Sequence, residues 1–234
     1  MTRKTLRKIS LRSFALIVTL ALTWQAQAQD AKTPYPSMAP LDQYLMERNA
    51  EIALARSAGP ESISRDAEVM VLGPHGYETA MKGQNGFVCM VQRSWAAPFD
   101  DPEFWNPKAV APICFNPAGA RSYLRLLIKQ TDLVLAGRSK AQMAETMSAA
   151  IRKKELPGME PGAMGYMLSK QTYNDRDGHW HPHLMFFAPL TDPMAWGASR
   201  GSPILGFKDD PNRVTVFLIP VRNWSDGTAD LGGN

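Results

Sequence analysis

The chain has 234 residues, of which 44% are hydrophobic, and its 26 basic and 22 acidic side chains give a formal net charge of +4 at pH 7. Five of the basic residues lie within the first twelve positions, so the chain beyond residue 28 carries 21 basic and 22 acidic side chains, a net charge of −1. Binding to nucleic acid requires a concentrated basic face, and this charge balance argues against a nucleic-acid partner.

The first 28 residues have the pattern of a cleavable export signal. A basic head ending at Arg12 is followed by the apolar run 13–24, which is shorter than the about 20 residues that a membrane-spanning helix needs. Ala26 and Ala28 then occupy the small-residue positions before a cleavage point at Gln29. We therefore expect residues 1–28 to be a secretory signal peptide. The mature protein is then periplasmic or extracellular, and it has no membrane contact after cleavage.

The first part of the mature chain predicts one helix and three strands. Residues 29–40 form a Pro-rich lead-in without periodicity, after which apolar side chains recur at helical spacing from Leu41 until Gly59-Pro60 stops the pattern. Three short runs rich in strand-forming residues follow, separated by glycine-containing turn sequences. These runs, which predict a small antiparallel meander, are 68–72, 77–81 and 87–93.

The second part of the chain predicts a loop, two helices and a return to strands. The segment 94–112 is rich in proline and acidic residues, which favours a long surface loop anchored by its aromatic side chains. Two helices are expected next, 116–137, which Asn116 can cap, and 139–156, which opens with a capping box. The polar tail 225–234 is expected to be frayed. Between the helices and the tail lie four strand-like runs, 164–170, 183–189, 203–207 and 213–221.

This order of elements predicts the fold class. Strands, then helices, then strands again, joined by tight turns, indicate an α+β domain. We expect an antiparallel sheet of short strands with about three helices packed against it, in a single domain that spans residues 41–224. A chain of this length can bury a substantial core.

Two cysteines, Cys89 and Cys114, lie in apolar strand-like surroundings. An exported protein enters a compartment in which disulfides form, so the sequence favours a disulfide between them. Two buried free thiols are the alternative. A catalytic thiol is disfavoured because neither sequence neighbourhood supplies a basic partner.

Three of the four histidines fall in the stretch DGHWHPHLMFF, at His179, His181 and His183. Side chains at every second position share a face of an extended strand, and Pro182 indicates the start or the edge of a strand. The sequence therefore predicts a histidine-rich rim of the sheet, at which these imidazoles and Trp180 line a shallow pocket for a small ligand. The rim could equally be a solvated surface without a binding role.

A zinc site is the alternative interpretation of the same stretch. Adjacent members of the histidine row have Cα atoms less than about 7 Å apart, so His181 and His183 can bind one zinc ion through their imidazoles. An acidic side chain or His75, the fourth histidine, would complete the ligand set. Two functional hypotheses follow: a small-ligand-binding or structural module, and a zinc-dependent hydrolase with a His-x-His pair.

Overall fold

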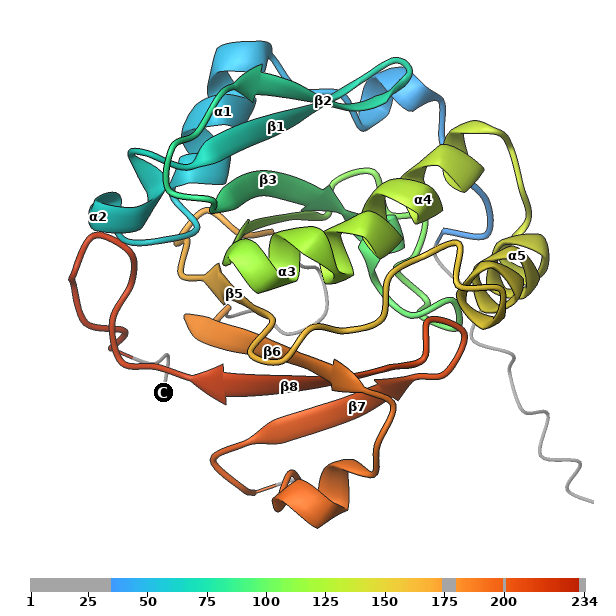
Figure 1. The fold of residues 1–234 in the computed structure, drawn as a ribbon. Coiled ribbons are helices and arrows are strands. Elements are labelled where there is room, and N and C mark those ends of the chain that lie inside the picture. The colour runs from blue at the N-terminus through green and yellow to red at the C-terminus, as the bar shows by residue number, and fades with distance from the viewer. Residues whose placement is uncertain (1–34, 174–179, 200, 232–234) are drawn as a thin grey trace, which may run out of the picture. The chain divides into compact units, whose positions relative to one another are not determined.

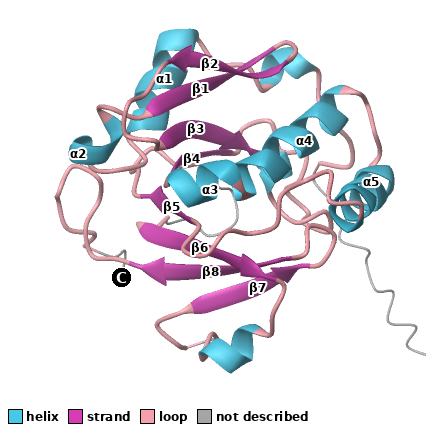
Figure 2. Cartoon of the chain, in the orientation of Figure 1, coloured by secondary structure: helices cyan, strands magenta, loops and turns pink. Residues whose placement is uncertain are grey.

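In the computed structural model, residues 33–234 form one compact unit, and the residues described are 35–173, 180–199 and 201–231. The predicted signal peptide, the first half of the Pro-rich lead-in and His179 lie outside these ranges. The unit is an α+β fold built on a mixed sheet of eight strands (Figures 1 and 2). The strands are β1 (Glu68–Gly73), β2 (Gly76–Met81), β3 (Val88–Arg93), β4 (Val110–Phe115), β5 (Met164–Met167), β6 (His183–Pro189), β7 (Leu205–Asp209) and β8 (Val214–Pro220).

The sheet has the strand order β2-β1-β3-β4-β5-β6-β8-β7, and its pairs are antiparallel except for β1 with β3. The predicted sheet is therefore confirmed as mostly antiparallel, but the predicted meander of the first three strands is wrong. Strand β3 does not pair with β2. It lies on the other side of β1 and runs parallel to it.

The turn after β2 explains this topology. The segment 82–87 passes across the start of β1, where Gln84 donates its backbone N–H to the carbonyl of Asp66 (2.8 Å). Gly83 lies so close to β1 that a Cβ atom built on it would be 2.1 Å from the backbone nitrogen of Glu68. A turn-forming sequence signals a change of direction, but it does not show whether the chain crosses its neighbouring strand.

We expect Gly83→Ala to lower the free energy of unfolding by about 1–3 kcal/mol, because the added methyl group would overlap main-chain atoms that can move only together with β1. Urea unfolding followed by circular dichroism measures this loss. Gly158→Ala is the matched control, since nothing lies within 4 Å of a Cβ at that position. Equal stability of the two variants would contradict the crossing described here.

The described residues contain five helices where the sequence predicts about three. Short or divided elements account for the difference. The predicted helix 116–137 is divided at Ser122, which has non-helical backbone angles and whose Oγ donates to the Ala118 carbonyl (2.6 Å). Such a back-bond bends or breaks a helix. The helices are α1 (Arg48–Arg56), α2 (Glu61–Ser64), α3 (Pro117–Arg121), α4 (Tyr123–Leu135) and α5 (Lys140–Arg152).

Helices cover both faces of the strands β1, β3 and β4. Cys89 and Val91 of β3 point toward Leu54 of α1, whereas the intervening Met90 packs in the core that includes Leu126 and Leu127 of α4. This alternation along one strand places α1 and α4 on opposite faces. Figure 1 accordingly shows α3 and α4 in front of the strands, whereas α1 lies behind β1.

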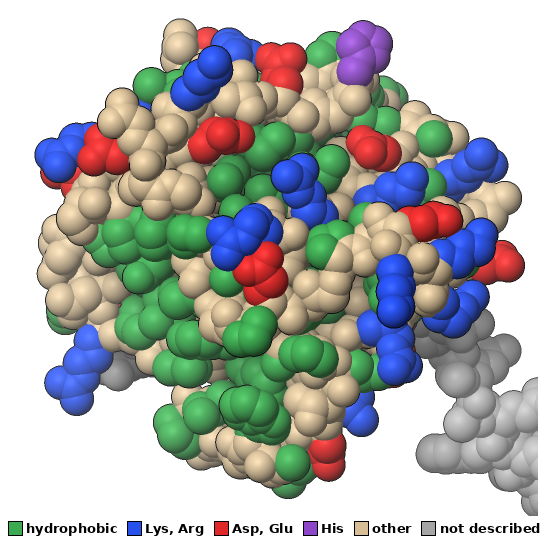
Figure 3. All heavy atoms as spheres, viewed as in Figure 1, with side chains coloured by type: hydrophobic (Ala, Val, Ile, Leu, Met, Phe, Trp, Pro, Cys, Tyr) green, Lys and Arg blue, Asp and Glu red, His purple; other side chains and the backbone are tan. Residues whose placement is uncertain are grey.

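Near one edge of the sheet, apolar side chains reach the surface. Hydrophobic side chains gather over the lower part of the face shown in Figure 3, where β6, β7 and β8 lie. Of the large exposed hydrophobic side chains near this edge, Met194 and Trp196 lie on the one-turn helix η3 (Pro193–Trp196), and Leu205 and Phe207 belong to the edge strand β7. No described helix is both long and apolar enough to span a membrane.

The loop between β3 and β4 is anchored by aromatic side chains, as predicted. Trp95, Phe104 and Trp105 are buried in the main core, and the indole N–H of Trp95 donates to Thr131 Oγ1 (3.0 Å). The loop is shorter than expected because β4 begins at Val110. These buried aromatic side chains hold the main chain directly after β3 in place. That part of the loop lines the candidate site.

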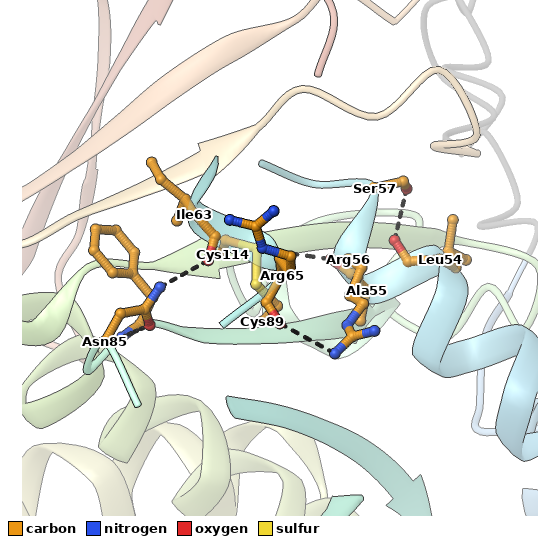
Figure 4. Close-up of a disulfide and its surroundings, with 10 residues drawn as sticks. Leu54, Ala55, Arg56, Ser57, Ile63, Arg65, Asn85, Cys89 and Cys114 are labelled. Atoms are coloured by element: carbon orange, nitrogen blue, oxygen red, sulfur yellow. Dashed lines mark hydrogen bonds between the residues drawn. A yellow bond between two sulfur atoms is a disulfide. The ribbon is translucent and has the colours of Figure 1, made fainter. Parts of the chain in front are cut away.

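The two cysteines form a disulfide, which confirms the sequence prediction. They occupy directly opposed positions on β3 and β4 and are fully buried. Figure 4 shows the bond beside Leu54 and Ala55 of α1. The disulfide thus ties two central strands together beneath the helix that covers them.

Candidate functional site

A pocket of about 360 Å³ lies where the ends of β3, β4, β5 and β6 meet the loop after β3. Its volume falls in the range of small-molecule sites, about 300–1,000 Å³. The lining side chains are mainly apolar, with a few polar groups among them. Those on which the argument depends are Ser94, Asp101, Glu103, Tyr123, Trp180 and His183.

Trp180 and His183 form one wall of this pocket. Their ring centroids are 4.8 Å apart, and the ring planes are inclined at 53°. His183 begins β6 and is only 7% exposed, whereas Trp180 lies in the irregular segment before the strand. The structure therefore brings together two of the four residues that the sequence places at a ligand pocket.

The protonation state of His183 follows from its contacts. Its Nδ1 lies 2.9 Å from the backbone carbonyl of His181, and a carbonyl can only accept, so Nδ1 carries the proton. Burial lowers the pKa of His183 below its ordinary value of 6.5, with the neighbouring His181 adding to this effect and the hydrogen bond opposing it. At neutral pH the ring is therefore uncharged, and its Nε2 is a hydrogen-bond acceptor.

Two other polar atoms belong to pocket-lining residues and have no partner in the described part of the chain. They are the indole Nε1 of Trp180 and the hydroxyl oxygen of Ser94, and both are shielded from solvent. Buried polar atoms without a hydrogen bond are rare in folded proteins, because each costs about 1–3 kcal/mol in lost solvation. Two such atoms therefore belong to residues that line one pocket.

The remaining polar groups set the charge of the pocket. Burial raises the pKa of Tyr123 above its ordinary value, and the charge of Asp209 adds to the rise, so the phenol stays protonated and can donate. Asp101 and Glu103 supply carboxylates. Arg93 also lines the pocket, but its guanidinium forms a fully buried ion pair with Glu51 on the α1 side of the sheet. Asp101 Oδ1 accepts the backbone N–H of Glu103 (2.7 Å), and Glu103 Oε2 accepts from the side-chain amide of Asn106 (2.8 Å).

The other predicted site residues lie elsewhere. The His181 side chain is 54% exposed, and its Nδ1 lies 2.6 Å from a carboxylate oxygen of Asp230. His75 occupies the exposed turn between β1 and β2, and β3, β4 and β5 lie between that hairpin and β6. His179 lies outside the described residues. Within the described ranges, no group of three or more His, Cys, Asp or Glu side chains is placed to hold a metal ion.

The separation of His181 from His183 has a simple cause. The rule that every second side chain shares a face holds only inside a strand, and β6 begins at His183 itself. His181 belongs to the irregular approach, so its ring points toward the C-terminal segment. That segment is held in turn by the backbone hydrogen bond from Ser225 to Leu168 (2.9 Å) and the ion pair of Lys170 with Asp226 (2.7 Å).

Ser94 and Tyr123 are site residues that sequence reasoning missed. Ser94 follows β3 directly, and Tyr123 opens α4 after the break at Ser122. One signal was present, because Ser94 and Trp95 are a polar and an aromatic residue at the end of an apolar strand. Nothing in the sequence indicates that this strand end meets the start of β6, since the two are about 90 residues apart along the chain.

Comparison with protein-family models, curated proteins and solved structures found no match. The function must therefore be argued from the geometry of this site.

We expect the stability of the protein to fall as the pH decreases below about 6.5. The folded state holds His183 neutral to a lower pH than the unfolded state does, so in this range the unfolded chain binds more protons. The variant His183→Asn keeps an N–H donor but has no side chain that titrates, so it loses the contribution of His183 to the pH dependence of stability. Urea unfolding at pH 7.5, 6 and 5 should show a smaller loss of stability in the variant. His75→Asn is the control, and parallel profiles for His183→Asn and the wild type would contradict the argument.

Proposed function

We propose that this chain is an exported protein that binds a small organic ligand in the pocket lined by Trp180 and His183. The observation that carries the proposal is the pair of unpartnered polar atoms, Trp180 Nε1 and Ser94 Oγ, on residues of one largely apolar pocket. Apolar walls with a few placed polar groups are the usual construction of ligand sites. A ligand with a hydrogen-bond acceptor would remove this cost where side-chain rotation brings either atom to the pocket surface.

Export is supported by two features, neither of which tests it directly. The first is the three-part pattern of residues 1–28. The second is the disulfide between Cys89 and Cys114, because such bonds persist mainly in oxidising compartments.

The zinc-hydrolase hypothesis gains no support from the described residues. His181 and His183 each engage Nδ1 in a contact with the protein, and they differ strongly in exposure. The hypothesis stays a prediction, which the metal content of the purified protein would check.

The ligand proposal is tested with Trp180→Phe. A set of small heteroaromatic amides is screened by thermal shift, and the Kd of each binder is then measured by calorimetry. We expect Trp180→Phe to weaken binding about tenfold, because it removes one buried donor and keeps an aromatic wall. Trp196→Phe is the matched control, since Trp196 is 61% exposed on η3. Equal affinity of both variants, or no binder to the folded wild type, would refute the proposal.

A further inference from the structure

The turn between β7 and β8 contains a buried carboxylate. Asp209, the last residue of β7, is 7% exposed. One of its carboxylate oxygens accepts the backbone N–H of Asn212 (3.3 Å), and the other accepts from the side-chain amide of the same residue (2.8 Å). No described cation forms an ion pair with Asp209. A buried carboxylate that is hydrogen-bonded but not paired with a cation is unfavourable in its charged form.

The charges around this carboxylate add to the cost of ionisation. Burial raises the pKa of Asp209 above its ordinary value, and the hydrogen bonds from Asn212 oppose the rise. The negative charges of Asp210, in the turn, and of Asp100, in the loop after β3, raise the pKa further. Helix α4 contributes the protonated phenol of Tyr123, and β8 contributes uncharged side chains opposite the end of β7. The described charges that act on Asp209 are therefore negative.

The same turn contacts two helices through polar side chains. The Asn212 amide also donates to Oε1 of Gln130 on α4 (3.2 Å), and Gln130 Nε2 donates in turn to the backbone carbonyl of Trp95. On the other side of the turn, Ser148 of α5 donates to the backbone carbonyl of Pro211 (3.1 Å). The buried carboxylate thus orients the side chain that joins the turn to α4.

We propose that Asp209 makes the β7–β8 turn a pH-sensitive latch, which docks more firmly on α4 and α5 when this carboxyl group is protonated. The protonated group carries no buried charge and still has an oxygen that can accept from Asn212. Because the folded chain keeps this proton to a higher pH than the unfolded chain does, the contribution of Asp209 to stability decreases as the pH rises through its folded-state pKa. This dependence has the opposite sign to that of His183.

Hydrogen exchange followed by mass spectrometry tests the latch on the oxidised mature chain. Protection factors, corrected for the intrinsic pH dependence of exchange, are measured at several pH values between 4.5 and 7.5. We expect the amides of residues 205–214 to be severalfold more protected at the acidic end, relative to those of β1 on the far side of the sheet. Asp209→Asn, which cannot ionise, should remove this difference.

Two further variants make the test specific to this carboxylate. Asp210→Asn changes the exposed neighbouring acid and should keep the pH dependence of the wild type. Asn212→Ala removes both donors to Asp209, so the protection of 205–214 should change at a higher pH. If Asp209→Asn does not fold, Asn212→Ala decides the question. Equal pH dependence in Asp209→Asn and the wild type, an unshifted transition in Asn212→Ala, or no relative change in the wild type would overturn the proposal.

Discussion

Glu51→Ala is expected to lower the free energy of unfolding by about 3–5 kcal/mol, the range measured when one partner of a buried ion pair is removed. Glu51 on α1 and Arg93 at the end of β3 have side chains that are 1% and 0% exposed, and Glu51 Oε1 lies 2.9 Å from Arg93 Nη2. The variant would leave a guanidinium buried without a counter-charge. Since small domains are stable by only about 5–15 kcal/mol, this is a large part of the total.

The pair also organises the backbone around it. Glu51 Oε1 accepts the backbone N–H of Leu72 (3.0 Å), and Arg93 donates to the carbonyls of Tyr44 (2.7 Å) and Val91 (2.6 Å). One ion pair thus connects α1, β1, β3 and the segment before α1. We therefore expect Glu51→Ala to weaken the packing of α1 on the sheet.

Urea unfolding distinguishes the loss of the counter-charge from the loss of packing. Glu51→Leu combined with Arg93→Leu should be more stable than Glu51→Ala, because an apolar pair leaves no charge unpaired. Arg48→Ala on the same helix removes an exposed ion pair with Glu78 and should change stability by less than about 1 kcal/mol. A Glu51→Ala variant as stable as Arg48→Ala would show that Arg93 reaches solvent.

This ion pair illustrates what sequence patterns leave out. The helical spacing of apolar residues places Ile52 and Ala55 on the buried face of α1, and α1 does pack through this side. The same spacing places Glu51, four residues before Ala55, on this face, but a charged residue is not expected to be buried there without a partner. Its burial becomes evident only when the arginine that neutralises it is placed by a strand about 40 residues later.

The elements of the fold were more predictable than their arrangement. Each strand-like run named from the sequence contains or overlaps a strand, because alternation and turn residues are local signals. The parallel pairing of β1 with β3 depends on the close approach of Gly83 to Glu68, which is a contact between segments. The break at Ser122 likewise depends on a single side-chain hydrogen bond.

The candidate site shows the same limit. The stretch around Trp180 and His183 was recognisable because histidines at alternating positions are uncommon on a strand approach. β6 begins at His183, so His181 lies before the strand and the rule of alternating faces does not apply to the two residues. The sequence therefore could not show that His181 contacts Asp230 whereas His183 is buried. For Ser94 the sequence offered only its place at the end of an apolar strand, since a serine acquires its role here from burial without a partner.

Reduction of the disulfide between Cys89 and Cys114 is expected to lower the free energy of unfolding by about 3.5 kcal/mol. The bond closes a loop with a sequence separation of 25. For a loop of this length, the entropy that the crosslink removes from the unfolded chain amounts to about 3.5 kcal/mol in the chain-entropy model. Urea unfolding of the oxidised chain, and of the same chain kept reduced throughout, measures the difference.

The position of the disulfide in the fold indicates whether its reduction would act mainly on the folded or on the unfolded state. Because Cys89 and Cys114 face each other across β3 and β4 and are buried under α1, the reduced thiols can stay in place and keep the core filled. The loss then arises mainly from the unfolded state, and the reduced folded protein should keep the circular dichroism of the oxidised one. Cys89→Ala combined with Cys114→Ala should lose more than reduction alone, because it also empties volume beside Leu54. Equal stability of the oxidised and reduced chains, with the free thiols verified by mass, would show that the crosslink does not constrain the unfolded chain.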